Sequence, residues 1–167
     1  LKMSKWDLAK TAQKSEHTFA LVQCGIMDQF ASLFGREDHV LILDCLTQEY
    51  EASKINITGY ELILIDSNVK HSLNDSEYNA RRDESTEALN RLSELQSSIQ
   101  NFRDVDPELL QSLKTDETWW KRAQHVVTEN LRVQAVSEAL KLHQMEEFGR
   151  LLKAGHDSER YHYEITC

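Results

Sequence analysis

The feature that most constrains the fold is a change of hydrophobic pattern about midway along the chain. Residues 39–45 (HVLILDC) and 60–66 (YELILID) are short runs rich in Val, Ile and Leu, which are typical of buried strands. A more exposed strand is expected between them, over residues 48–57. Beyond residue 73, apolar residues recur every three or four positions, which is the spacing of amphipathic helices. Strands early and helices late predict an α+β fold.

Helices are expected over residues 3–22, 26–34, 74–98, 107–113, 117–142 and 145–153. Gly25 separates the first two, and Gly35 and Gly155 are expected to end the helices that precede them. Asp106 stands where an N-cap is needed, directly before Pro107, which suits the first helical turn. Residues 163–166, close to the end of the chain, read as a strand again.

The charge balance argues against two classes of partner. The chain carries 19 Lys and Arg against 28 Asp and Glu, a net charge of -9. Such a chain repels phosphate backbones and anionic lipids unless a strong basic patch is present, and its most basic stretch, Arg81 and Arg82, is flanked by acidic residues. We therefore expect no nucleic-acid partner and no membrane partner.

Cysteine and glycine spacing excludes several kinds of site. Cys24, Cys45 and Cys167 are widely separated, and no signal peptide precedes them, so reduced thiols in a cytoplasmic protein are expected. The five glycines are spaced so that neither G-x-G-x-x-G nor a P-loop can be written. The chain therefore has no phosphate cradle of its own, and its His and Cys spacing offers no zinc site.

Two places could carry chemistry. Asp28 stands in the first turn of a short apolar helix just after Gly25, where the helix dipole favours an ionised carboxylate that could be partly desolvated. An ordinary first-turn aspartate is the alternative. Glu16 lies one helix earlier and reads equally as a solvated helix residue. Residues 67–72, which leave the second apolar run, are the other candidate, with a plain polar turn as the alternative.

Five blocks together are more specific than any of these signals alone. They are residues 24–30 (CGIMDQF), 67–73 (SNVKHSL), 76–82 (SEYNARR), 122–130 (RAQHVVTEN) and 155–158 (GHDS). In order and spacing they resemble the galactokinases, of the GHMP sugar and metabolite kinases. The similarity covers nearly the whole chain.

The resemblance implies an internal segment of the two-lobed GHMP kinase fold, in which short, mostly antiparallel strands precede a helix-rich lobe. Residues 1–60 would belong to the N-terminal lobe, including the helix with the catalytic aspartate, and residues 61–167 to the C-terminal lobe. The sugar-recognition segment, the ATP phosphate loop and a later glycine-rich loop of the family would lie outside this chain.

The activity implied by the resemblance is transfer of the γ-phosphoryl group of ATP to the anomeric hydroxyl of galactose, which gives galactose 1-phosphate. Asp28 would act as base or orienting carboxylate beside that hydroxyl. Gly25 and Tyr78 would contact the sugar together with Asp28.

The same resemblance implies ATP and Mg²⁺ as cofactors. Glu16 would help to hold Mg²⁺, and Lys70 and Ser72 would lie near the nucleotide. Because the remaining parts of the kinase are missing, the isolated segment is expected to be inactive and to leave apolar faces uncovered. The alternatives are a non-catalytic sensor of galactose and ATP, an N-acetylgalactosamine kinase, and a helical interaction module.

Overall fold

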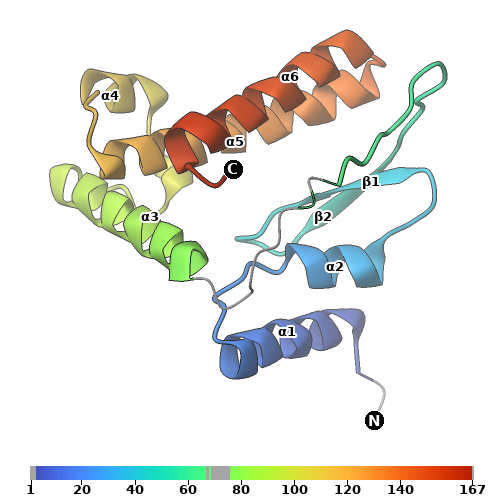
Figure 1. The fold of residues 1–167 in the computed structure, drawn as a ribbon, viewed down its shortest axis with the longest axis horizontal. Helices are drawn as coiled ribbons and strands as arrows, with labels where there is room; N and C mark the ends of the chain where they lie inside the picture. Colours follow the sequence, from blue (N-terminus) through green and yellow to red (C-terminus); the bar gives the residue numbers. More distant parts are fainter. Residues whose placement is uncertain (1–2, 67, 69–75, 167) are drawn as a thin grey trace. The chain divides into compact units, whose positions relative to one another are not determined.

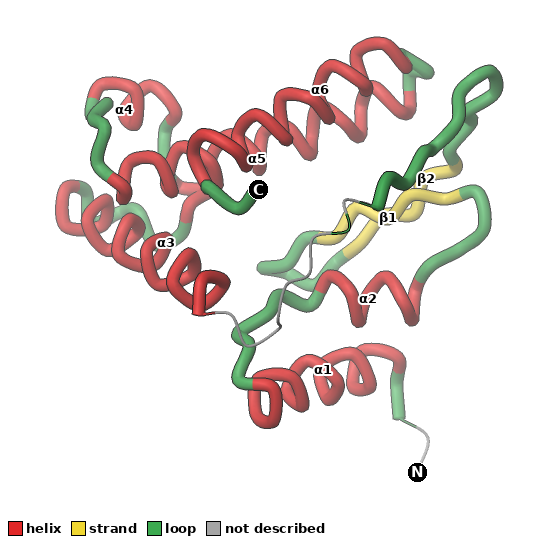
Figure 2. Tube along the Cα trace, viewed as in Figure 1, coloured by secondary structure: helices red, strands yellow, loops and turns green. Residues whose placement is uncertain are grey.

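The computed structural model describes residues 3–66, 68 and 76–166. Two compact units form, Leu1–Asn79 and Ala80–Cys167, and Figures 1 and 2 show their elements. The described residues contain helices and one antiparallel pair of strands, which confirms the α+β class. The expected division into lobes near residue 60 concerns a longer protein and stays a prediction.

The first unit begins with helix α1 (Lys5–Ser15), which Ser4 and Asp7 cap reciprocally. Its last turn widens into a π-helical turn, η1 (Glu16–Ala20). Leu21 follows in the left-handed conformation, with φ 58° and ψ 23°. The predicted helix over residues 3–22 is thus present, but it ends in a π turn that hydrophobic spacing could not show.

Four aromatic rings fix helix α2 (Met27–Phe34) in the first unit. The Phe30 ring lies 5.3 Å from that of Trp6 in α1, and 5.2 Å from that of Tyr50 in strand β2 (Tyr50–Lys54). Phe34 stacks on Phe30, with 4.7 Å between their ring centres. Because Phe30 and Phe34 are buried, one face of α2 is committed to packing against α1 and β2.

Gly35 ends α2 as predicted, but for a different reason. Its φ of -49° is not left-handed, so the usual argument for a C-terminal glycine does not apply. A Cβ at this position would lie 2.7 Å from the Ala31 carbonyl oxygen. Glycine is needed here because the backbone approaches too closely for a side chain.

Strands β1 (His39–Leu43) and β2 form an antiparallel pair in which Val40 lies opposite Ser53 and Ile42 opposite Glu51. Both strands fall within the predicted ranges, 39–45 and 48–57. β2 is the more exposed of the two, as expected.

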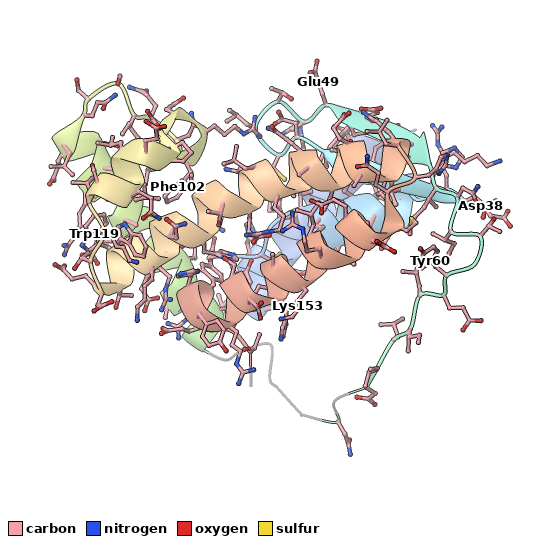
Figure 3. All side chains as sticks on the ribbon, turned by 90° about the horizontal axis from the view of Figure 1, so that it is seen from above. Asp38, Glu49, Tyr60, Phe102, Trp119 and Lys153 are labelled. Atoms are coloured by element: carbon pink, nitrogen blue, oxygen red, sulfur yellow. The ribbon has the colours of Figure 1, made fainter. Side chains whose placement is uncertain are left out.

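The predicted buried strand over residues 60–66 is wrong for this chain. These residues have no regular secondary structure, and Leu62, Ile63, Leu64 and Ile65 are each at least 74% exposed. Figure 3 shows the segment that begins at Tyr60 extending its side chains into open space. An apolar run becomes a buried strand only when a neighbouring strand pairs with it, and the described residues supply no such strand here. The predicted uncovered apolar surface is confirmed at this segment.

The second unit is helical. Its elements are α3 (Ser76–Leu95), which begins at the end of the first unit, the 3-10 turn η2 (Phe102–Asp104), α4 (Pro107–Ser112), α5 (Thr118–Lys141), α6 (Met145–Ser158) and the π-helical turn η3 (Glu159–Tyr163). The predicted start of α4 is confirmed, because the Asp106 side chain accepts a hydrogen bond from the Glu108 backbone and Pro107 occupies the first turn. Figure 1 shows α6 lying along α5.

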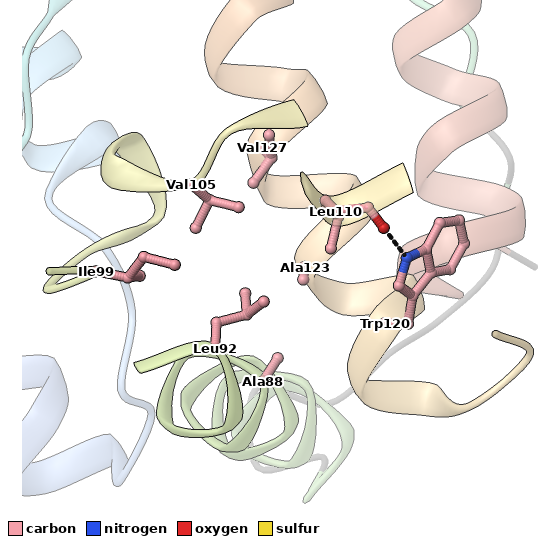
Figure 4. Packing of buried hydrophobic residues seen from close by; sticks show 8 residues of the cluster. All are labelled: Ala88, Leu92, Ile99, Val105, Leu110, Trp120, Ala123 and Val127. Carbon is pink, nitrogen blue, oxygen red and sulfur yellow. Dashed lines mark hydrogen bonds between the residues drawn. The ribbon is translucent and has the colours of Figure 1, made fainter. Parts of the chain in front are cut away.

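The core of this unit gathers apolar side chains from α3, α4, α5 and the segments between them (Figure 4). Its members are Ala88, Leu92, Ile99, Val105, Leu110, Trp120, Ala123 and Val127. The Trp120 indole nitrogen donates to the Leu110 carbonyl oxygen at 2.8 Å, which satisfies the polar atom of a buried ring. Leu95, the last residue of α3, is 62% exposed and is not part of this core.

Two other expectations near the C-terminal end are wrong. Gly155 does not end α6, which continues to Ser158. A single glycine lowers helix stability without preventing helix formation where packing favours it. Residues 163–166 are not a strand, because η3 occupies residues up to Tyr163 and Glu164 is left-handed, with φ 58°.

A buried arginine ties this end of the chain to α3 and α5. Arg122, 1% exposed, donates to Glu84 at 2.7 Å and to Glu164 at 2.8 Å, and also to the His162 carbonyl oxygen. Three acceptors satisfy a guanidinium whose burial would otherwise be costly.

None of the helices in the described residues is long and apolar enough to cross a membrane. Cys24 and Cys45 form no disulfide within the described residues, and Cys167 lies outside them.

Protonation of His125 should make the second unit pH-sensitive. Its ring stacks on Tyr163 at 4.4 Å and its Nδ1 lies 3.0 Å from the Ser158 hydroxyl. Burial, followed by the charges of Arg132, His162 and Arg122, lowers the pKa of His125 to about 4. In the unfolded chain this histidine takes up a proton near pH 6.5, whereas in the folded protein it stays neutral down to about pH 4. Protonation therefore favours the unfolded chain, so stability is greatest above about pH 6.5 and decreases as the pH falls towards 4.

We therefore expect the free energy of unfolding to fall less steeply between about pH 6.5 and 4.5 in His125→Asn than in the unchanged protein. Denaturant titrations at several pH values measure this slope. His143→Asn, which changes an exposed histidine, serves as the control. Equal slopes for His125→Asn and the unchanged protein would contradict the assignment.

Candidate active site

The candidate site is built around the loop that joins η1 to α2, residues 21–26. The carbonyl oxygen of Cys24 accepts a hydrogen bond from Gln13 Nε2 at 3.1 Å and lies 2.9 Å from His17 Nε2. Gln13 and His17 are four residues apart, so both reach the loop from the same side of the helix end. Side chains of the preceding helix therefore hold this loop in place.

The Glu16 carboxylate forms a second connection. Its Oε1 accepts a hydrogen bond from Gln29 Nε2 at 2.6 Å, and its Oε2 accepts one from the Cys24 thiol at 3.2 Å. Burial raises the pKa of the Cys24 thiol, and the hydrogen bond to Glu16 and its negative charge act in the same direction. Glu16 thus joins the end of α1 to the loop and to the buried first-turn residue Gln29 of α2.

Asp28 stands in the first turn of α2, as predicted. Its side chain is exposed, which corrects the expectation of a partly desolvated carboxylate: Gln29 and Phe30 turn inward while Asp28 faces solvent. The N-cap residue of α2, Ile26, gives no side-chain cap to the helix. An uncapped helix N-terminus favours a negative charge in its first turn.

Gly25 is exposed, and nothing in the described residues requires a glycine there. Its φ is not left-handed, and a Cβ at this position would have no atom within 4 Å. Within the described residues, neither backbone strain nor close packing accounts for a glycine at position 25. A glycine of this kind leaves room for a ligand to approach the backbone.

Tyr78 lies near the start of α3 and is 49% exposed. The next residue, Asn79, contacts the candidate loop. Its Nδ2 donates to the Leu21 carbonyl oxygen at 3.0 Å, and its Oδ1 accepts from the Gln23 amide at 3.1 Å. The structure therefore brings the start of α3 to the loop that precedes Asp28.

The structure does not place every predicted site residue. Lys70 and Ser72 lie outside the described residues. Gln29 and Asn79 were not predicted to act in the site. Both residues stand inside blocks that carry the resemblance, 24–30 and 76–82, and this is a signal that could have been used. The hydrogen bonds of Asn79 span 56 and 58 residues, so only the structure shows that it contacts the loop.

Glu16 has the chemistry of a magnesium ligand. Its side chain is exposed, and each carboxylate oxygen has accepted one hydrogen bond, which leaves lone pairs available. The described part of the chain contains no group of three His, Cys, Asp or Glu that could hold a metal ion. Mg²⁺ that accompanies a nucleotide is commonly held by one or two carboxylates together with phosphates and water, so a single carboxylate fits.

A depression of about 340 Å³ lies in the second unit, between α3 and the start of α5. Charged side chains line much of it, including Glu84 and Arg91, and it contains none of the predicted site residues. Arg91 pairs there with Glu87 and Glu117. These are partly exposed ion pairs on the surface of the helical unit.

A family match, sequence relatives and a solved structure all relate this chain to sugar kinases of the GHMP group. Residues 1–36 match the family described as the GHMP kinases N terminal domain. A galactokinase of Thermotoga petrophila is 47% identical over 163 residues, which cover 98% of this chain and 45% of that protein. The galactokinase of Bacillus subtilis is 39% identical over 163 residues, which cover 96% of this chain and 42% of that protein.

A solved structure agrees in fold. The crystal structure of Lactococcus lactis galactokinase complexed with galactose matches with a TM-score of 0.93 and 34% identity, over 100% of this chain and 44% of that one. The chain spans less than half the length of these relatives. In sequence and in fold, the chain is similar to a segment of these galactokinases, and its first 36 residues match the GHMP kinase family.

Proposed function

We propose that this chain is the part of a galactokinase that supplies the carboxylate acting on the sugar, in the ATP- and Mg²⁺-dependent phosphorylation of galactose to galactose 1-phosphate. One observation carries the proposal. Asp28 is exposed in the uncapped first turn of α2, in a chain that resembles galactokinases from end to end. The activity belongs to the longer protein, because the chain spans less than half of its relatives.

The proposed division of work follows from the chemistry. Phosphoryl transfer requires mainly in-line positioning and neutralisation of charge. The Asp28 carboxylate would accept the proton of the anomeric hydroxyl or orient that hydroxyl towards the phosphorus. The open backbone at Gly25 would lie against the sugar, and the half-exposed ring and hydroxyl of Tyr78 would contact an apolar face and a hydroxyl group.

Glu16 would help to hold Mg²⁺, whose role when bound is to neutralise charge on the phosphates of ATP. Its hydrogen bonds to Gln29 and Cys24 orient the carboxylate. Lys70 and Ser72 are proposed to lie near the nucleotide. The free thiols at Cys24 and Cys45 support a reducing compartment such as the cytoplasm.

The first test removes the proposed base. In the full galactokinase chain that contains this segment, we expect Asp28→Asn to lower kcat for galactose by about 10²- to 10⁴-fold, the usual contribution of a general base. The KM for ATP should change little, because Asp28 is assigned to the sugar. ADP release in the presence of galactose measures the rate.

Asp38→Asn is the matched control for this experiment. Asp38 is another exposed aspartate of the first unit, and its left-handed φ of 56° suits asparagine. It should leave kcat unchanged. Full activity in Asp28→Asn would exclude Asp28 from the catalytic step.

The second test uses the open space at Gly25. Gly25→Ala should leave the folded protein as stable as before, because the added Cβ meets nothing within 4 Å. It should raise the KM for galactose about tenfold, because the methyl group would occupy the space assigned to the sugar. Thermal unfolding and steady-state kinetics measure the two effects.

Gly149→Ala is the control, because its Cβ also meets nothing and Gly149 lies within α6. It should increase stability by about 0.5–1 kcal/mol without affecting the KM for galactose. An unchanged KM for galactose in Gly25→Ala would show that the sugar does not approach this backbone.

Substrate choice between galactose and N-acetylgalactosamine is tested by comparing kcat/KM for the two sugars in the same full chain. The proposal expects galactose to be preferred. If N-acetylgalactosamine were preferred, the proposed reaction type would stand, but the proposed substrate would be wrong.

A further inference from the structure

The loop that leads to Asp28 is held by side chains rather than by regular secondary structure. It begins at Leu21, whose left-handed backbone is unfavourable for a residue with a Cβ. The Leu21 side chain is 70% exposed, so packing of that side chain does not enforce the conformation. A strained backbone persists only where its surroundings hold it, and the hydrogen bond from Asn79 to the Leu21 carbonyl oxygen is a contact that can do so.

The two hydrogen bonds of Asn79 allow only one arrangement of the side chain. The Leu21 carbonyl oxygen must receive a donor, and the Gln23 amide must find an acceptor, so the NH₂ group faces Leu21 and the oxygen faces Gln23. The carboxamide thus pairs with the loop as a peptide group of a neighbouring strand would. Neither a carboxylate nor an aliphatic side chain can make both bonds.

Asn79 lies between two parts of the candidate site, so its hydrogen bonds to the loop affect how these parts are arranged. Tyr78 is its immediate neighbour, and the loop it holds continues through Gly25 into the first turn of α2. The Gln13 and His17 contacts hold the other end of the same loop, at the Cys24 carbonyl oxygen. Asn79 therefore connects the backbone beside Tyr78 to the loop that leads to Asp28.

We propose that Asn79 is a positioning residue for the sugar. Its carboxamide fixes the loop 21–26 against the start of α3, so that Gly25, Asp28 and Tyr78 are presented to galactose as one prearranged set. This inference rests on the proposed function. Prearrangement of binding groups lowers the cost of reaching the reactive geometry, so its loss affects both sugar affinity and rate.

The experiment uses the full galactokinase chain with three variants. Asn79→Asp has the same shape and keeps the acceptor for Gln23, but places an oxygen against the Leu21 carbonyl oxygen. Asn79→Leu removes both hydrogen bonds. Asn90→Leu changes an exposed asparagine of the same helix and serves as the control.

We expect both Asn79 variants to lower kcat/KM for galactose at least tenfold while the KM for ATP stays within twofold. A general loss of folded protein would lower the active fraction without raising the KM for galactose alone. Asn90→Leu should match the unchanged enzyme. If Asn79→Asp also matches it, the inference is wrong.

A double-mutant cycle separates positioning from independent effects. Tyr78→Phe removes one hydroxyl, and it should cost less kcat/KM for galactose in the Asn79→Asp background than in the unchanged protein, because the hydroxyl is already misplaced there. Strict additivity of the two losses would contradict the inference.

Hydrogen exchange provides a readout independent of turnover. The Gln23 amide should exchange faster in Asn79→Leu, whereas Asn90→Leu should leave it unchanged. Unchanged exchange in Asn79→Leu would contradict the inference.

If the unchanged enzyme fails to phosphorylate galactose, the proposed function is wrong. If it succeeds and the Asn79 variants retain full kcat/KM, the function stands and the positioning role is wrong.

Discussion

The Glu16 carboxylate is the contact on which the arrangement of the candidate site depends. Its two oxygens accept hydrogen bonds from the buried Gln29 amide at 2.6 Å and from the Cys24 thiol at 3.2 Å, so one side chain joins the π turn, the loop and α2. The π turn itself widens the end of α1 at the residue that makes these bonds. A carboxylate retains lone pairs after two hydrogen bonds, so the same group can orient the site and help to hold a metal ion. Structure and proposed chemistry therefore converge on one residue.

Asp28 owes its exposure to the packing on the opposite face of its helix. The rings of Phe30 and Phe34 contact Trp6 and Tyr50, and this commits α2 to a single orientation. The helix therefore presents the exposed Asp28 side chain to solvent. A carboxylate that acts on a sugar hydroxyl needs a fixed backbone and an exposed side chain. The protein must hold the carboxylate in position and still leave its oxygens available to the sugar.

Local patterns in the sequence predicted local structure well. Helical spacing located α1 to α6, the Asp106–Pro107 pair located the start of α4, and two apolar runs of similar composition suggested strands. The run over residues 60–66 shows the limit, because whether such a run is buried depends on a partner strand that its own sequence does not specify. Asn79 shows the same limit for the site: its hydrogen bonds span 56 and 58 residues, and no periodicity encodes them. Resemblance to the galactokinases supplied the proposed roles of Gly25, Asp28 and Tyr78, whereas only the structure revealed what holds their backbones.

In the reaction that we propose for the longer protein, the anomeric oxygen of galactose, deprotonated or oriented by Asp28, attacks the phosphorus of ATP. Galactose labelled with ¹⁸O at the anomeric position tests this directly in the full chain, with ³¹P NMR of the product. The account predicts a sugar phosphate in which the label bridges carbon and phosphorus, seen as an isotope shift of the phosphorus resonance. A sugar phosphate without the shift, or phosphate released without any sugar phosphate, would contradict it.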